Sequence, residues 1–287
     1  IFYVALALLD PGDEAVYPNP GFPIYESMIQ YTGAKAVPVA VREDRDWSLD
    51  VDELARSLTP KTKLVILNSP HNPTGGMIPM EDLHRIAELA LRYDFMILSD
   101  EIYSRVIYSG PYHSLFSLPL MKERTILLDG FSKIYAMTGW RLGYGVMPES
   151  FALQISKLQT NAASCTATFT QLAGIEALKG NQGKTEEMVE EFRRRRDLIV
   201  GGLNDIPGIS CKTPAGAFYV FPNIKKLGIP SKKLADLLLE EAGVACLSGT
   251  AFGSYGEGYL RFSYANSQEN IREALSRVRA LVKNFKV

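Results

Sequence analysis

Short aliphatic or β-branched runs alternate with longer stretches of helical period between Ala15 and Pro148, and this alternation constrains the fold more than any other feature. It is typical of βαβ units, so it predicts a three-layer α/β domain with a mainly parallel sheet. Residues 79–93 place leucine, isoleucine and alanine on one helical face, which predicts a crossover helix. The predicted strands are residues 15–17, 36–41, 64–67, 95–98, 125–128 and 143–147.

The second half of the chain has a different pattern. Residues 184–203 carry four glutamates ahead of four consecutive arginines, which predicts a long, exposed helix. The arginines at 193–196 could instead form a nucleic-acid patch, but the glutamates cancel their charge, so we interpret them as a solvated helix face. Beyond Pro207 the pattern predicts a smaller α+β domain. Its predicted strands and helices are residues 217–221, 245–247 and 259–263, and residues 231–242 and 267–285.

The chain is long enough for two cores, with 287 residues of which 46% are hydrophobic. We expect a large domain over residues 1–183 and a small domain, including the connecting helix, over 184–287. Residues 1–9 are apolar and resemble a helix entered partway. The large domain is therefore expected to lack its N-terminal part.

Charge and cysteine usage narrow the class of partner. A formal net charge of -1 leaves no basic footprint for nucleic acid, so small molecules are the expected partners. The three cysteines lie far apart, with neither a disulfide pattern nor metal-ligand spacing, and we expect them to be reduced. No apolar run reaches the length of about 20 residues needed to span a bilayer. We expect a soluble, cytoplasmic protein without a bound metal.

Polar residues follow three of the predicted strands directly. The segments are NSPHNPTGG at 68–76, SDEIY at 99–103 and DGFSK at 129–133. Ligands of a parallel α/β sheet gather at the carboxyl ends of its strands, so these segments are expected to share one site. Each also has a simpler interpretation: Asn72 in a turn, Asp100 as the cap of a following helix, and Lys133 on the surface. Their common placement favours the site.

Four motifs in order resemble one known family. SKIYAMTGWRLGY at 132–144 occurs with NPTG at 72–75, SDEIY at 99–103 and YLRFSYA at 259–265. Together they resemble the class I and II aminotransferases of fold type I, the aspartate aminotransferase superfamily. The resemblance implies pyridoxal 5'-phosphate as cofactor and a homodimer, in which the polar stretch 159–170 is expected to face the partner.

The resemblance also implies roles for the cofactor-binding residues. Lys133 would carry the cofactor as a Schiff base and then act as general base and acid. Asp100 would pair with the pyridinium nitrogen, while Tyr103, placed one helical turn further on, and Asn72 would donate to the phenolic oxygen. Arg141 would bind the phosphate, with a structural ion pair as the alternative.

Three further residues are expected on weaker grounds. Phe22, within YPNPGFPIY, aligns with the aromatic that stacks on the cofactor ring, or else is a core phenylalanine. Ser132 would be a phosphate or loop ligand, although many relatives have a serine where this chain has Gly130. Arg261 in YLRFSYA would bind the substrate's α-carboxylate with Asn72, or else is a surface charge.

The resemblance therefore implies amino transfer between an L-amino acid and a 2-oxo acid, with glutamate and 2-oxoglutarate paired with aspartate, alanine or an aromatic partner. Two alternatives stay open: a pyridoxal-phosphate lyase or synthase of the same fold, and a cofactor-sensing domain without turnover. The Gly-rich phosphate loop that the family places before the first large-domain helix is absent from the sequence given. The sequence does not decide whether residues before Ile1 complete it.

Overall fold

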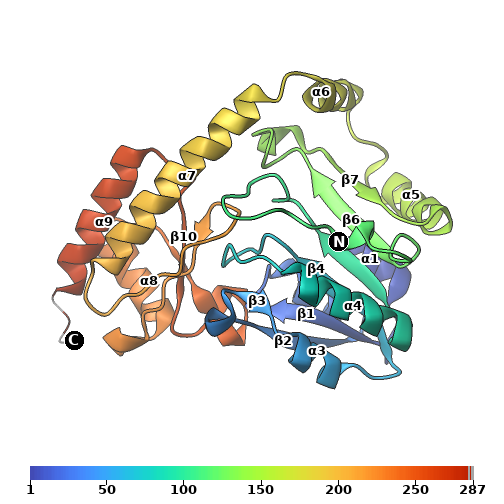
Figure 1. The fold of residues 1–287 in the computed structure, drawn as a ribbon, viewed down its shortest axis with the longest axis horizontal. Coiled ribbons are helices and arrows are strands. Elements are labelled where there is room, and N and C mark those ends of the chain that lie inside the picture. The colour runs from blue at the N-terminus through green and yellow to red at the C-terminus, as the bar shows by residue number, and fades with distance from the viewer. Residues whose placement is uncertain (284, 286–287) are drawn as a thin grey trace.

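A seven-stranded sheet forms the larger half of the molecule within residues 1–283 and 285, which are the residues that the computed structural model describes (Figure 1). The strand order is β3-β2-β1-β4-β5-β6-β7. The five inner strands, β2, β1, β4, β5 and β6, run parallel to one another. The edge strands β3 and β7 are antiparallel to their neighbours. The bounds are β1 (Glu14–Asn19), β2 (Lys35–Arg42), β3 (Ser48–Leu49), β4 (Thr62–Asn68), β5 (Met96–Asp100), β6 (Thr125–Gly130) and β7 (Gly143–Val146).

The predicted α/β class and mainly parallel sheet are confirmed. The six predicted strands correspond to the strands from β1 to β7 apart from β3, which sequence reasoning missed. At two residues, β3 is too short for alternation of apolar and polar side chains to be visible. The central strands β4 and β5 are almost entirely buried, which explains why they consist of continuous apolar runs.

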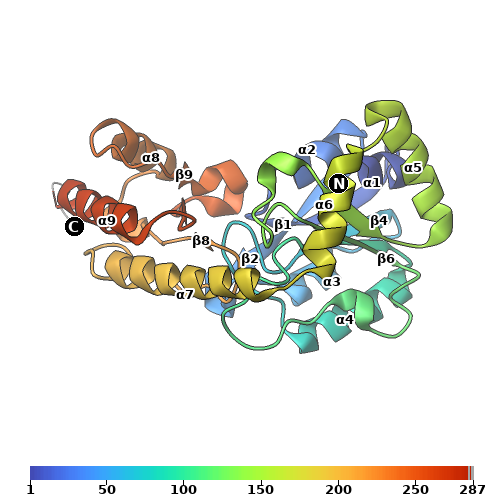
Figure 2. The ribbon, with the colours of Figure 1, turned by 90° about the horizontal axis from the view of Figure 1, so that it is seen from above.

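Helices cover both faces of this sheet, as Figure 2 shows. One face packs against α1 (Phe2–Leu8), α2 (Ile24–Tyr31) and α5 (Glu149–Ala163), and the other against α3 (Val51–Ser57) and α4 (Met80–Tyr93). The crossover helix predicted over 79–93 is α4. It buries Leu83, Ile86, Ala87 and Ala90 at helical spacing. Among the described residues no helix is both long and apolar enough to cross a membrane.

The long helix α7 (Gly183–Asn204) leads from the large sheet into the rest of the chain (Figure 1). Its glutamates and arginines pair three or four residues apart, as in Arg193 with Glu190 and Arg195 with Glu191. The prediction of a solvated face was wrong for Arg196, which is buried. Its guanidinium lies 4.9 Å from the ring centre of Tyr108, because the opposite face of α7 packs into a core.

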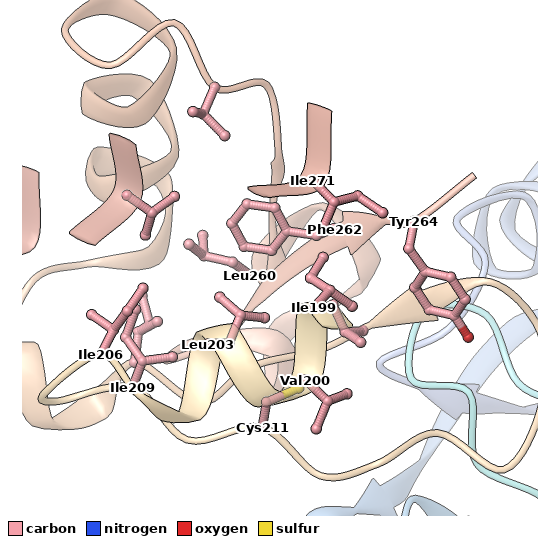
Figure 3. Packing of buried hydrophobic residues seen from close by; sticks show 14 of the residues in the cluster. Ile199, Val200, Leu203, Ile206, Ile209, Cys211, Leu260, Phe262, Tyr264 and Ile271 are labelled. Atoms are coloured by element: carbon pink, nitrogen blue, oxygen red, sulfur yellow. The ribbon is translucent and has the colours of Figure 1, made fainter. Parts of the chain in front are cut away.

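That core belongs to a smaller unit with a three-stranded sheet of order β8-β10-β9, counted over the described residues. Figure 3 shows Ile199 and Leu203 of α7 packed towards Leu260 and Phe262 of the sheet and Ile271 of the last helix. The strand predicted over 217–221 is shortened because Ala217 has a left-handed backbone, with φ of 59°. The bounds are β8 (Tyr219–Val220), α8 (Ser231–Glu240), β9 (Leu247–Ser248), β10 (Leu260–Ser263) and α9 (Gln268–Val282).

Candidate active site

The carboxyl ends of β4, β5 and β6 meet at one edge of the large sheet. Asn68 at the end of β4 is paired with Asp100 at the end of β5, and Asp100 is paired with Leu128 of β6. A cavity of about 750 Å³ opens at this edge, a size usual for small-molecule sites. It is lined by all eight side chains selected from the sequence: Phe22, Asn72, Asp100, Tyr103, Ser132, Lys133, Arg141 and Arg261.

Lys133 follows β6 and is partly buried in the cavity wall. Within the described ranges its amine makes no hydrogen bond or ion pair, and Nζ lies 5.9 Å and 5.8 Å from the ring centres of Tyr103 and Phe218. Burial, followed by the charges of Arg141 and Arg261, lowers the pKa of Lys133. This environment differs from that of an ordinary surface lysine and favours the neutral, reactive amine.

Asp100 ends β5 with only 8% of its surface exposed. The Tyr25 hydroxyl donates to its Oδ2 at 2.6 Å, and burial raises the pKa of the Asp100 carboxyl despite that bond. No helix follows, because residues 102–105 form turns. Both the helix-cap alternative for Asp100 and the expected helical spacing to Tyr103 were therefore wrong, although both side chains line the cavity.

Tyr103 and Asn72 are held by contacts that the sequence did not reveal. The hydroxyls of Tyr103 and Tyr219 lie 2.9 Å apart, and Tyr103 is 3% exposed. The Asn72 N–H donates to Asn68 Oδ1 at 2.9 Å, which ties the NPTG segment to the end of β4. In that segment Gly75 has φ of 74°, and a Cβ there would lie 2.5 Å from Pro214. The turn formed by the NPTG segment is therefore part of the cavity wall.

Arg261 on β10 reaches the cavity from the smaller unit. Its Nη1 donates to Asn72 Oδ1 at 3.0 Å, and its guanidinium lies 4.5 Å and 4.6 Å from the ring centres of Tyr219 and Phe252. In the described part of the chain its buried Nε has no hydrogen-bond partner and the guanidinium has no carboxylate partner. The surface-charge alternative was therefore wrong, since a half-buried guanidinium with spare donors fits an anionic ligand.

Arg141 and Phe22 line the same cavity with fewer contacts. Arg141 is exposed and donates to the Thr138 carbonyl at 2.9 Å, and it forms no ion pair with any residue that the structure describes. The ion-pair alternative for Arg141 is not supported. Phe22 packs edge-on against Tyr25, with ring centres 5.7 Å apart, and also touches the core. Phe22 therefore lines the cavity and packs against the core at the same time, so stacking on a ring and packing in the core do not exclude each other. Ser132 is partly buried at the cavity wall.

Gly130 stands where many relatives have a serine, and it lies at a close contact between two strands. Gly130 is paired with Gly143 where β6 and β7 meet. A Cβ at Gly130 would lie 3.1 Å from Gly143 Cα and 3.2 Å from Ile102 Cδ1, tighter than ordinary van der Waals contact. A serine here would require these neighbours to shift by a few tenths of an ångström. With glycine, this part of the wall offers backbone rather than a hydroxyl.

Five polar side chains of the cavity were given no role from the sequence, namely Tyr25, Asn68, Asp129, Tyr144 and Tyr219. Asp129 follows the predicted strand 125–128 and begins the segment 129–133 that was expected at the site, but it was given no role of its own. Tyr144 donates to Asp129 Oδ2 at 3.1 Å, and burial raises the pKa of Asp129. Tyr25 and Tyr219 carry no such signal, because their partners lie far away in the chain.

Among the described residues, the groups around this cavity fit a phosphorylated aromatic aldehyde: an amine without an ion-pair partner, a buried carboxyl group, phenols and two arginines. A sequence profile of the family described as aminotransferase class I and II matches residues 1–278. The chain belongs to this family. Class I and II aminotransferases are pyridoxal-phosphate enzymes of fold type I, and this chain is accordingly a transaminase of amino-acid metabolism.

Relatives within the family agree. The aromatic-amino-acid aminotransferase 2 of Thermococcus litoralis is 42% identical over 282 residues, which are 97% of this chain and 72% of that protein. The aspartate aminotransferase of Pyrococcus abyssi is 42% identical over 284 residues, 98% of this chain and 73% of that protein.

Solved aminotransferase structures share the fold. The aromatic aminotransferase of Pyrococcus horikoshii OT3 superimposes with a TM-score of 0.96 at 41% identity, over 98% of this chain and 76% of that chain. The Thermus thermophilus aspartate aminotransferase with maleate has a TM-score of 0.91 at 37% identity, over 98% of this chain and 72% of that chain. The sheet, its helices and the smaller unit therefore belong to an architecture common to transaminases.

Proposed function

We propose that this transaminase moves an amino group between an L-amino acid and a 2-oxo acid, with pyridoxal 5'-phosphate bound to Lys133. One observation carries the proposal: a partly buried amine without an ion-pair partner among the described residues shares a cavity with the buried Asp100 carboxyl. When bound, pyridoxal phosphate supplies an electron sink that acidifies the Cα–H bond of an amino acid.

Different residues would hold three parts of the cofactor: its ring nitrogen, its phenolic oxygen and its phosphate. Asp100 would face the ring nitrogen, Tyr103 and Asn72 the phenolic oxygen, and Arg141 with Ser132 the phosphate. Asp100 suits its role because the Tyr25 hydroxyl fixes its orientation. Tyr103 suits its role because burial raises the pKa of its phenol, which therefore stays a donor at neutral pH. Phe22 would cover one side of the ring and exclude water.

The proton transfer would be carried out by Lys133. Its Nζ would accept the proton from the substrate Cα and would return it to the aldehyde-derived carbon of the cofactor. This proton transfer requires a neutral amine near neutral pH. Burial and the charges of Arg141 and Arg261 lower the pKa of Lys133 towards that range. Asp100 acts against this shift, so Lys133 lies between opposing charges.

The α-carboxylate of the substrate would be bound by Arg261 with help from Asn72. The Arg261–Asn72 hydrogen bond holds the guanidinium at the cavity, and the unpartnered Nε adds a donor. We propose glutamate and 2-oxoglutarate as one pair, with aspartate, alanine or an aromatic amino acid as the other partner. The names of relatives support this range, and maleate in the Thermus structure is a dicarboxylate.

We propose a homodimer in which a second copy covers an apolar surface on α5 and on α6 (Thr168–Lys179). Leu153, Phe169, Leu172 and Leu178 on this surface are each more than half exposed, at 58%, 69%, 61% and 55%. Large exposed apolar side chains three residues apart on one helix, such as Phe169 and Leu172 of α6, are typical of interfaces. Residues 159–170 lie in the same region and border Arg141, which supports their placement at the partner's site.

We also propose that the chain divides into a large domain over residues 1–183 and a small domain over 184–287. The two sheets, one on each side of the start of α7, support this division. The cysteines Cys165, Cys211 and Cys246 are free, which supports a reducing, cytoplasmic location.

A single-turnover experiment tests the reaction. The purified protein loaded with pyridoxal phosphate is given glutamate alone, and we expect release of one equivalent of 2-oxoglutarate per subunit, after which release stops until a second 2-oxo acid is added. Continuous release of pyruvate and ammonia from β-chloroalanine, which carries a leaving group on Cβ that glutamate lacks, would indicate the lyase alternative. Binding without any product would indicate the sensor alternative.

Borohydride reduction followed by peptide mass analysis tests the attachment. We expect the mass of the cofactor on the peptide that contains Lys133. Its recovery on another lysine, or on none, would contradict the assignment.

A further inference from the structure

Glu43 joins the two sheets of the molecule outside the candidate site. It begins a 3-10 turn (Glu43–Arg45) directly after β2 of the large sheet. Its Oε2 accepts hydrogen bonds from Asn223 Nδ2 at 2.7 Å and from the Tyr259 hydroxyl at 2.9 Å. Both donors belong to the smaller unit, so a single carboxylate oxygen receives two bonds across the junction. Bonds to a charged acceptor are stronger than neutral ones.

The Tyr259 ring is held on several sides. It is stacked on Phe221, with ring centres 5.1 Å apart and an interplanar angle of 9°, and it packs edge-on against Trp47 at 5.1 Å. The Lys225 amine lies 3.0 Å from its hydroxyl. Tyr259 is only 6% exposed. A ring fixed in this way transmits a displacement of its hydroxyl to the backbone instead of absorbing it.

Tyr259 is connected to Arg261 through the backbone of one strand. Asn223 and Tyr259 form an isolated antiparallel bridge, and β10 begins at the next residue with Arg261 as its second member. Residues two apart on a strand point to the same face. Among the described residues, the Arg261 side chain makes one hydrogen bond, which it donates to Asn72 of the large-sheet half at 3.0 Å. The position of β10 relative to the NPTG segment therefore determines whether this contact forms.

We propose that Glu43 is a positioning residue that holds β10 against the large sheet so that Arg261 is aligned to bind the substrate's α-carboxylate. The inference rests on the role proposed above for Arg261. Glu43 itself lines a separate cavity of about 720 Å³, which shares no lining residue with the candidate site. Its effect on binding would therefore be exerted through Tyr259 and β10 and not by contact with a ligand.

The test uses the holoenzyme and the unreactive dicarboxylate maleate. For Glu43→Ala we expect the dissociation constant of maleate, measured by calorimetry, and the KM for glutamate to rise about tenfold, because two charge-assisted bonds are lost. We expect kcat to stay within about twofold, because Lys133 and Asp100 are not moved. Glu43→Gln keeps an acceptor oxygen and is expected to restore binding to within about threefold of the original.

Two further variants keep the result interpretable. Asp44→Ala is the matched control: Asp44 neighbours Glu43, is exposed, and has no hydrogen bond or ion pair in the described part of the chain, so we expect no change. Should Glu43→Ala fail to fold, Tyr259→Phe removes one of the two bonds to Glu43 and is expected to raise the maleate dissociation constant about threefold. Unaltered maleate binding in Glu43→Ala, or in Tyr259→Phe, would overturn the proposal.

Arg261→Ala separates this inference from the proposed function. Loss of maleate binding in Arg261→Ala with unchanged binding in Glu43→Ala would remove only the role of Glu43. Unchanged maleate binding in Arg261→Ala would remove the proposed role of Arg261 as well. Equal falls in kcat and in 1/KM for Glu43→Ala, accompanied by a lower Tm and no rescue by Glu43→Gln, would indicate a merely structural residue.

Discussion

The cavity has two walls that are built differently. The buried wall is formed by Asn72, Asp100, Tyr103, Tyr219 and Arg261. Their polar groups bond to one another, to the end of β4 or, for Asp100, to Tyr25 of α2. The exposed wall is formed by Ser132, Arg141 and Tyr144, with the apolar surface of α5 and α6 beyond it. The first wall owes its geometry to packing within one chain. The second has little such packing, which is why we assign its completion to a second copy.

Lys133 stands between the two walls, and its loss is expected to have the largest effect. Lys133→Ala removes the amine that accepts and returns the proton, so kcat is expected to fall about 10³-fold or more. The measurement is steady-state transamination of glutamate. The free energy of unfolding should be no lower, because in the part of the chain that the structure describes the amine makes no hydrogen bond or ion pair. Retention of more than a tenth of the activity would contradict this role.

Asp100→Asn tests the buried wall. Loss of the charge that faces the cofactor is expected to lower kcat/KM about 10²-fold. The free energy of unfolding, by contrast, should rise at neutral pH. Burial raises the pKa of Asp100 above the ordinary 3.8, so the charged carboxylate is less stable in the folded chain than in the unfolded one. That cost is absent below pH 3.8 and appears as pH rises through the folded pKa.

The free energy of unfolding of Asp100→Asn, in protein without cofactor, should therefore exceed that of the original at pH 7, and the difference should disappear near pH 4. Denaturant titrations at the two pH values measure it. Asp10→Asn, which changes an exposed carboxylate, serves as the control. A destabilised Asp100→Asn at pH 7 would show that the carboxylate is held more favourably than its burial indicates.

Phe169→Ser combined with Leu172→Ser tests the exposed wall. Both side chains are mostly exposed in the single chain, at 69% and 61%, so the fold should persist. Association should weaken about tenfold or more, because two large apolar side chains leave the proposed interface. Sedimentation velocity measures the association. Leu239→Ser changes an equally apolar exposed residue on α8 and should leave the dimer intact. A wild-type monomer would contradict the proposal.

Arg141→Gln is expected to have the smallest effect. It tests whether a charge on the exposed wall shifts the pKa of Lys133. The positive charge of Arg141 lowers the pKa of Lys133, so its removal should raise that pKa. Because Arg141 is exposed, solvent screens most of its influence. The pH dependence of Lys133 acylation in protein without cofactor reports the change, and its midpoint should move to higher pH. A move to lower pH would contradict the stated cause.

Much of the fold could be predicted from the sequence because its signals are local. The buried runs of β4 and β5 and the helical face of α4 appear directly as apolar periodicity. The site residues that follow strands, Asp100 and Lys133, were found by the same local rule. Arg196 was misinterpreted because its burial depends on Tyr108, which lies 88 positions earlier in the chain and carries no local signal.

The sequence by itself determined most strands of the large sheet, its crossover helix and the polar groups at the strand ends, since these depend on near neighbours in the chain. Only the tertiary structure decided what each polar group meets. Tyr25 bonds to Asp100 across 75 positions, Tyr103 to Tyr219 across 116 and Tyr259 to Glu43 across 216. Such pairs form when separate elements pack together, and no periodicity records them, because the chain between the partners is free to vary.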